Sequence, residues 1–282
     1  MKIILSRKGF DSKYGGCASP ILPDGTMLSL PIPGEREADA FQVEYADLLN
    51  ESVGLSYDEI WSALGKKKYR CGQVCHLDPD IRKIHRKREV EGWTPAFGQC
   101  EGAQTHLENQ GVGLGDLFLF FGWFRPAERG TKAPIQYIKK SQSVHALYGY
   151  LQVGEIVKGE DIRKSLGWHP HAAQSHCQSK GNTLYLPTKE LSLPGIPDGL
   201  PGYGVFCYGQ DLVLTAPGMS RSKWHMLDWM KSATISHHSA ESLHADYFQS
   251  AAIGQEFVIS ECPEAVTWAS EIFSNHAKEL VQ

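Results

Sequence analysis

The most distinct pattern in the chain is an apolar run near its middle. Residues 117–121, Leu-Phe-Leu-Phe-Phe, are apolar at every position and follow the turn residues Gly115 and Asp116. An apolar run without polar alternation is typical of a strand that is covered on both faces, so it predicts a central strand. A shorter apolar run at residues 2–5 predicts a buried first strand.

Further strands are predicted in the second half of the chain. Residues 144–157 form a long, mainly apolar segment, and its glycines Gly149 and Gly154 suggest a bend or bulge of the kind that barrels need. Shorter strands are predicted at residues 183–187, 204–208, 211–215 and 255–260.

Three helices are predicted from apolar residues at helical spacing. The first covers residues 38–50, and the second begins at a capping box of Ser56 and Glu59 and ends at Gly65. The third begins at Pro263 and carries an apolar stripe through Val266, Ala269, Ile272, Phe273, Ala277 and Leu280. The elements together predict an α/β protein of the α+β type, with a mixed or antiparallel β core, flanking helices and a C-terminal helix.

Length and composition predict one domain over residues 1–282. The 282 residues are 41% hydrophobic, which is enough to build a core without disulfides, and seven irregularly spaced cysteines predict reduced thiols. The start of the chain turns polar after three apolar residues, and no run approaches the roughly 20 apolar residues that cross a bilayer. We therefore expect a cytoplasmic protein with no membrane partner.

The charge is unevenly distributed along the chain. A net charge of -4 argues against binding nucleic acid by bulk charge. Residues 66–88, however, carry nine Lys or Arg against Asp78 and Asp80, so this segment is +7 and the remainder is 19 - 30 = -11. A patch that contacts phosphate and a merely solvated face are both consistent with such a run.

Short blocks spread over most of the chain resemble a known family. They are Ser6–Ser12, Gly15-Gly16, Ser19-Pro20, His76–Asp80, Phe97–Gln99, Ala103-Gln104, His106-Leu107 and Gly115–Phe124. These blocks look like those of the third of the nucleotide-modification-associated domain families. The resemblance implies a protein that acts with systems that modify bases in nucleic acid, with nucleotide or nucleic acid as its partner. The resemblance implies the kind of system in which the protein acts, but no particular reaction.

The middle of the chain is similar to a second group. The turn at Gly115-Asp116, the apolar strand and the segment Gly149–Glu155 resemble the barrel core of PUA-like domains, which include ASCH and EVE modules. This likeness implies a PUA-like barrel around residues 112–215 and a pocket that holds a base. A Gly-Asp pair before a strand is also ordinary turn chemistry, so both interpretations stay open.

The loop after the first strand concentrates groups that bind anions. Arg7 and Lys8 supply cations and Ser12 a hydroxyl, at the carboxyl end of a strand, where α/β folds commonly bind anions. A nucleotide phosphate would suit this loop, with Asp11 as a catalytic group beside it, although the glycine spacing matches neither a Walker loop nor a dinucleotide fingerprint. The alternative is a solvated turn in which Arg7 pairs with Asp11.

A second candidate site follows at His76, Asp78 and Asp80. Alternate residues of an extended chain point the same way, so these three side chains are predicted on one face, where they suit general acid-base catalysis or a hard divalent metal. Alternatively, the carboxylates balance the basic run or cap a helix that begins at Ile81. Two residues of the blocks that carry the resemblance are further candidates for substrate binding: Gln99 and His106.

The third candidate site is a group of histidines. His169, His171 and His176 are candidate ligands of a transition metal, although twelve histidines in one chain also produce chance clusters of surface or core residues. Further histidines and a carboxylate follow at His225, Asp228, His237 and His238. A zinc site of Cys71, Cys75 and Cys100 is disfavoured because the spacing departs from the usual pairs.

Two functions of different classes fit these features. The first is an enzyme that acts on a nucleotide or nucleobase. The second is a reader without catalysis that holds a modified base in a PUA-like pocket, with Trp123 or Tyr148 stacked on it. In an enzyme, Arg7, Asp11, His76 and Asp78 should face one cleft, whereas in a reader they should be dispersed and the pocket should be aromatic. An iron-dependent oxygenase that uses the histidines is a third hypothesis.

Overall fold

The computed structural model describes residues 1–37, 41–65, 70–252, 254–260, 262–278 and 280. Within them lie the helices α1 (Tyr57–Leu64), α2 (Glu101–Asn109), α3 (Glu160–Ser165), α4 (Gln174–Gln178) and α5 (Pro263–His276). Short 3₁₀ turns are η1 (Tyr45–Asp47), η2 (Lys83–His85), η3 (Pro170–Ala172), η4 (Gln210–Leu212), η5 (Asp228–Lys231) and η6 (Ala240–Ser242).

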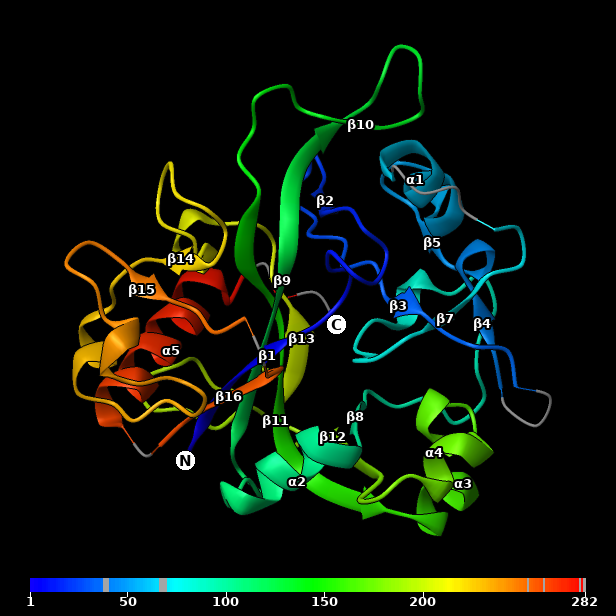
Figure 1. The fold of residues 1–282 in the computed structure, drawn as a ribbon. Coiled ribbons are helices and arrows are strands. Elements are labelled where there is room, and N and C mark those ends of the chain that lie inside the picture. Colours follow the sequence, from blue (N-terminus) through cyan, green and yellow to red (C-terminus); the bar gives the residue numbers. More distant parts are fainter. Residues whose placement is uncertain (38–40, 66–69, 253, 261, 279, 281–282) are drawn as a thin grey trace.

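The strands lie mostly in one large sheet (Figure 1). They are β1 (Ile3–Arg7), β2 (Ser19–Ile21), β3 (Ile32–Pro33), β4 (Val43–Glu44), β5 (Leu49–Asn50), β6 (Leu55–Ser56), β7 (Val74–His76), β8 (Phe97–Gln99), β9 (Leu117–Glu128), β10 (Gln136–Tyr137), β11 (Val144–Lys158), β12 (Thr183–Pro187), β13 (Tyr203–Val205), β14 (Lys223–Trp224), β15 (Phe248–Gln249) and β16 (Glu256–Ile259). The sheet runs in the order β16-β1-β9-β11-β12-β8, with β2, β10 and β13 paired alongside. β1 and β2 are parallel to β9 and the other pairings are antiparallel, so the predicted mixed α+β fold is confirmed.

The predicted central strand is β9. Each residue from Leu117 to Phe121 is 0% exposed, and β9 pairs with β1 on one side and with β11 on the other. The predicted bend in the long strand β11 is also confirmed, since its register shifts between Leu147 and Gly149. A Cβ atom at Gly149 would come within 2.6 Å of the Ile81 Cδ1 and 3.0 Å of the Gly204 carbonyl oxygen, so neighbouring segments approach the backbone closely here.

Helix α5 lies to one side of the two long strands, whereas α1 and the short strands β3 to β7 lie to the other (Figure 1). The buried face of α5 includes Ala269 and Phe273, and the Phe273 ring meets the Tyr150 ring edge-on at 4.6 Å between centroids. The capping box of Ser56 and Glu59 begins α1 as predicted. No helix among the described residues is long and apolar enough to cross a membrane.

Two predicted elements are wrong. Residues 41–50 form β4, η1 and β5 instead of a helix, because Tyr45 is buried with its hydroxyl donating to the Pro31 carbonyl at 2.5 Å; residues 38–40 lie outside the described part. Residues 211–215 form no regular strand, since Val213 and Thr215 bridge to different partners, Ala146 and Trp224. The strand predicted at 204–208 is β13 and ends at Val205.

The burial of Leu119 gives a direct test of the central strand. Leu119→Asp places an unpaired charge at a fully buried position, so we expect no soluble, cooperatively unfolding protein. Leu119→Ala should still fold, with a free energy of unfolding lowered by about 2–5 kcal/mol. Leu114→Asp is the matched control, since Leu114 is 69% exposed and should tolerate the charge. A cooperative thermal melt of Leu119→Asp like that of the wild type would contradict the assignment.

Candidate functional site

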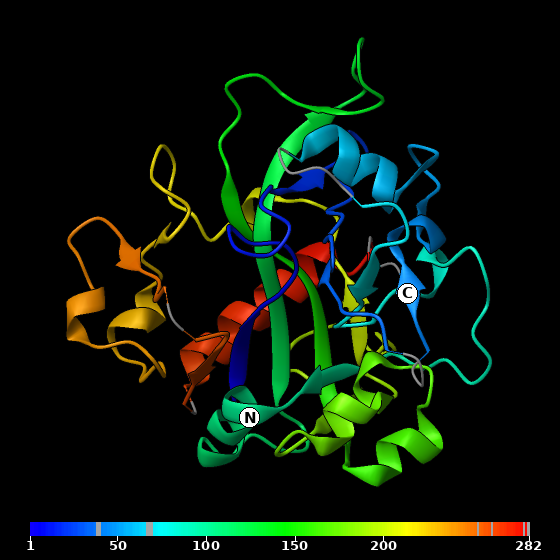
Figure 2. The same cartoon turned by 45° about the vertical axis from the view of Figure 1, so that its right-hand side comes forward.

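A cavity of about 340 Å³ lies at the carboxyl end of β1 and is lined mainly by polar side chains; we call it the polar cavity. Its walls come from segments far apart in the sequence, namely the loop after β1, the ends of β7 and β8, the turn η3 with helix α4, and Ala252, Gly254 and Gln255. Eight of the predicted site residues line it: Arg7, Lys8, Asp11, His76, Asp78, Gln99, His171 and His176. Figure 2 shows α3 and α4 below the blue-to-cyan segments that hold the short strands of the first hundred residues.

A buried ion pair forms one wall of the polar cavity. The Lys8 Nζ lies 3.0 Å from the Glu256 Oε1, and the two side chains are 8% and 1% exposed. Gln99 donates a second hydrogen bond to the same oxygen, and the Lys8 ammonium lies 4.3 Å from the centre of the Phe97 ring. The pair therefore joins the segments that follow β1, begin β16 and end β8.

Arg7 is held by backbone carbonyls and aromatic rings. Its guanidinium donates to the carbonyls of Ala251 at 2.5 Å and Ala252 at 3.2 Å, and it lies between the rings of Phe121 and Phe257. Burial lowers the pKa of Arg7 from its usual value. The Arg7 Nε atom is buried without a hydrogen-bond partner among the described residues.

Asp11 and Ser12 have other local partners. The Asp11 carboxylate accepts from the backbone N–H groups of Lys13 and Tyr14 at 2.7 and 2.6 Å, which shapes the loop. The Ser12 hydroxyl accepts from Arg221, and Ser12 is not among the residues that line the polar cavity. The hydrogen bonds of Arg7 therefore go to backbone carbonyls, whereas the solvated-turn alternative pairs Arg7 with Asp11.

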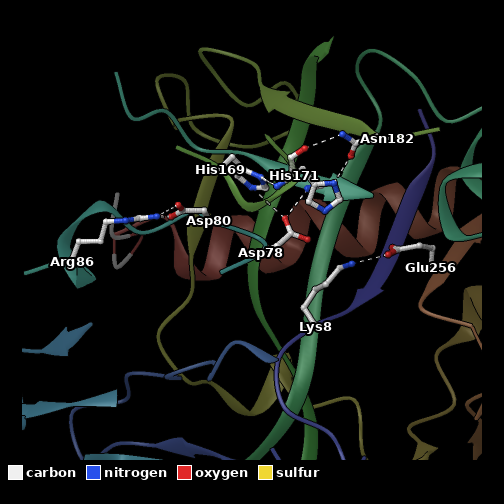
Figure 3. A network of polar contacts seen from close by, with 9 residues as sticks. Lys8, Asp78, Asp80, Arg86, His169, His171, Asn182 and Glu256 are labelled. Carbon is white, nitrogen blue, oxygen red and sulfur yellow. Dashed lines mark hydrogen bonds and ion pairs between the residues drawn. The ribbon is translucent and has the colours of Figure 1, made fainter. Parts of the chain in front are cut away.

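Asp78 lies between Lys8 and the histidines (Figure 3). Its Oδ1 accepts the Gly98 N–H at 2.7 Å and lies 3.6 Å from the Nε2 of His169. Because the His169 Nδ1 accepts the His171 N–H at 3.2 Å, the ring proton of neutral His169 sits on Nε2 and faces Asp78. Burial raises the pKa of Asp78 to about 7, against the opposing charge of Lys8.

The structure separates Asp80 from His76 and Asp78. Asp80 binds Arg86 through both carboxylate oxygens and turns away from the polar cavity (Figure 3). Burial raises the pKa of Asp80, while the hydrogen bonds from Arg86 oppose the shift. The prediction that all three side chains share one face is wrong, because the Asp80 backbone bridges to Ala96 and its carboxylate pairs with the buried Arg86 side chain.

Three histidines meet at the other wall of the polar cavity. The ligand atoms of His76, His171 and His176 all lie within 4.8 Å of one another. Burial lowers the pKa of His76 to about 3, that of His171 well below its usual value, and that of His176 to a smaller extent. His169, predicted with the group, points at Asp78, whereas His76 takes its place near the other two.

Other predicted residues lie outside the polar cavity. His106 hydrogen-bonds to Ser236 at 2.9 Å, and its ring packs against that of His237. Within the basic segment, Arg86 is neutralised by Asp80 and Lys83 pairs with Glu89 at 3.8 Å. The exposed cations of its described part include Lys87 and Arg88, while residues 66–69 lie outside the described residues.

Sequence reasoning missed Glu256 and Asn182. Glu256 had a signal, since a carboxylate at the start of the apolar strand 256–259 needs a cation when it is buried. Asn182 had none, because its contacts with His171, at 2.7 and 2.9 Å, arise from a chain path that local patterns do not reveal.

The comparisons with known proteins give one match. A model of the family described as nucleotide modification associated domain 3 matches residues 2–260. No curated protein and no solved structure matches the chain. The family resemblance of the sequence blocks is therefore confirmed, whereas the likeness to PUA-like barrels stays a prediction.

The Lys8–Glu256 pair yields a test of what holds the polar cavity together. Lys8→Met leaves a buried carboxylate without its cation, so the free energy of unfolding should fall by about 3–5 kcal/mol. Adding Glu256→Gln should recover most of this loss, because the Glu256 charge that Lys8 balances is then removed as well. Urea unfolding of the single and double variants measures both effects.

The matched control for this cycle is Lys158→Met. Lys158 pairs with Glu108 at 2.7 Å, but these side chains are 58% and 45% exposed, so the loss should stay below about 1 kcal/mol. Equal losses for Lys8→Met and Lys158→Met would contradict the assigned role of the buried pair.

Proposed function

The chain belongs to the nucleotide modification associated domain 3 family, and we propose that it is an enzyme that modifies a base or a nucleotide in the polar cavity. The observation that carries the proposal is convergence. Arg7, Asp11, His76 and Asp78, from segments about 70 residues apart, line the same cavity. A structural role for each residue separately gives no reason for this convergence.

The chemistry of the walls supports catalysis over simple retention of a base. Cationic Arg7, the Asp78 carboxylate and three imidazoles all line the polar cavity. The volume, about 340 Å³, is in the range of small-molecule sites, and Tyr14 is the one aromatic side chain besides histidine among the described residues that line it. A reader would present an aromatic cage for the base instead.

The aromatic residues named for a reader are engaged elsewhere. The Arg221 guanidinium lies 4.0 Å from the centre of the Trp123 ring and covers it. Tyr148 is 4% exposed and packs against the rings of Phe120 and Phe124. These contacts cover one face of Trp123 and bury most of Tyr148, which supports the enzyme over a reader that stacks a base on either residue.

In the proposed enzyme, Arg7 is the cation that contacts the substrate's phosphate. The charge of Lys8 is balanced by Glu256, so Lys8 mainly shapes the wall, whereas the guanidinium of Arg7 donates only to neutral carbonyls among its described hydrogen bonds. Gln99, whose amide is fixed by Glu256, lies where it can contact the base or sugar. Asp78, whose Oδ1 lies 3.6 Å from the His169 Nε2, then supplies a carboxylate.

The proposal predicts a chemical product that depends on Asp78. Nucleosides from the DNA, RNA and nucleotide pools of cells that express the wild type should include a species of altered mass. Asp78→Asn keeps the acceptor for the Gly98 N–H but removes the charge, so the yield should fall by about 10²–10⁴-fold if Asp78 acts in acid-base catalysis. Quantitative mass spectrometry of the digests measures the yield.

The control is Asp228→Asn, because the Asp228 side chain is 99% exposed and pairs only with Lys231 among its described contacts. The control should match the wild type. Unaltered nucleosides in every sample, together with wild-type protein that binds DNA containing modified bases, would favour the reader.

A second prediction separates free nucleotide from nucleic acid as the substrate. If nucleic acid binds along the exposed cations beside η2, replacing both Lys87 and Arg88 by Ser should weaken binding and lower the slope of log affinity against log salt by about two. Fluorescence anisotropy with labelled oligonucleotides at several salt concentrations gives the slope. Replacing Lys132 and Lys139, exposed in the segment between β9 and β11, is the control. A slope unchanged by the first pair would exclude this path and favour a free nucleotide.

A further inference from the structure

We propose that His76, His171 and His176 bind one divalent transition-metal ion, with Zn²⁺ as the representative, and leave a coordination position open to the polar cavity. The three ligand atoms lie within 4.8 Å of one another. They come from three elements, since His76 ends β7, His171 lies in η3 and His176 lies in α4. The ring centroids are 5.3, 5.2 and 4.5 Å apart, so the three rings form a compact triangle.

The hydrogen bonds of His171 leave the lone pair of its Nε2 available to a metal ion. The Asn182 Nδ2 donates to the His171 carbonyl at 2.9 Å, which fixes the orientation of the Asn182 amide. The Asn182 Oδ1 therefore faces the His171 Nδ1 at 2.7 Å and accepts its proton. Because Nδ1 carries the proton, the lone pair of the neutral ring is on Nε2. Such an outer hydrogen bond is typical of histidines that bind metals.

His176 has a matching outer contact. The Ser175 hydroxyl donates its single proton to Glu37 at 2.7 Å, so its oxygen can only accept from the Nδ1 of His176 at 3.3 Å. This arrangement again leaves the lone pair on Nε2. Two of the three rings are thus oriented by a hydrogen bond through Nδ1, which a chance cluster of histidines would not require.

The backbone beside His171 is shaped for its ring. A Cβ atom at Gly98 would come within 2.4 Å of the His171 Cδ2 and 2.5 Å of its Nε2. Only glycine at this position lets the imidazole lie against β8 and present its Nε2 to the other two rings. The same Gly98 donates its N–H to Asp78, so the strand positions both the imidazole and the carboxylate.

The ligand set selects the class of metal. Three imidazoles favour zinc, iron, nickel or copper, whereas magnesium and calcium prefer oxygen ligands. Zn–N bonds of about 2.0–2.1 Å place tetrahedral ligand atoms about 3.3 Å apart, so the rings close on the ion through small rotations. Three protein ligands with an open fourth position are typical of a catalytic site, and all three rings line the polar cavity. A catalytic role of the metal ion rests on the proposed function, whereas the binding of the metal ion does not.

The test is metal binding to the full chain without nucleotide. After removal of bound metal by a chelator, the wild type should take up one Zn²⁺ per chain in a competition titration with a zinc indicator. Bound Co²⁺ should show the intense visible absorption of a tetrahedral nitrogen site. Zn²⁺ should also raise the melting temperature, because it binds the folded state.

Variants assign the ligands. His76→Gln and His176→Gln, at half-buried positions, should each lower Zn²⁺ affinity at least tenfold and abolish the Co²⁺ spectrum. Asn182→Ala keeps all three ligands and should lower the affinity about 10–100-fold through the lost outer hydrogen bond. His225→Gln, at an exposed position, is the control and should bind as the wild type does. A thermal melt of each metal-free variant shows that it is folded.

The outcomes are distinct for the two proposals. Absence of stoichiometric Zn²⁺ binding by the wild type, or unchanged affinity in His76→Gln and His176→Gln, would overturn the metal site and leave the nucleotide enzyme standing. Zn²⁺ binding lost in these variants but kept in His225→Gln supports the site, even if no altered nucleoside is found and the proposed function fails.

Discussion

The polar cavity depends on the buried ion pair between Lys8 and Glu256. A Lys and a Glu that are both under 10% exposed stabilise each other by balancing their charges, and Gln99 donates a further hydrogen bond to the Glu256 Oε1. The pair joins residues that follow β1, begin β16 and end β8. The geometry at the carboxyl end of β1 is therefore set by a charge interaction that no single strand contains.

The two walls of the polar cavity are held by different means. On the β1 side, Arg7 ties the loop at Ala251 and Ala252 to the sheet and keeps its charge, because carbonyls do not neutralise it. On the opposite side, β8 carries Gly98, whose N–H holds Asp78 and whose missing side chain admits His171. An anionic substrate held by Arg7 and a metal ion held by the histidines would then lie in the same cavity, which suits metal-assisted chemistry on a nucleotide.

Sequence patterns predicted the parts of the structure that local physics determines. The all-apolar run of β9, the bulge of β11 at Gly149 and the capping box of α1 each follow from residues close in the sequence. The helix expected at 38–50 failed in its described part because Tyr45 makes a tertiary hydrogen bond that periodicity cannot reveal. Likewise, the basic and acidic residues around His76 did not reveal that Asp80 forms an ion pair with Arg86. They also did not reveal that His76 lies beside His171, which is 95 positions later in the sequence.

The polar cavity is proposed as the site of nucleotide modification. Diffraction from crystals of the zinc-loaded full chain soaked with a nucleoside monophosphate would show where zinc and nucleotide bind. We expect anomalous zinc scattering between His76, His171 and His176, with the nucleotide in the polar cavity, its phosphate within hydrogen-bond distance of Arg7 and its base or sugar toward the zinc. Nucleotide bound elsewhere on the protein, with the polar cavity unchanged beside its zinc, would contradict the claim that this cavity is the site of nucleotide modification.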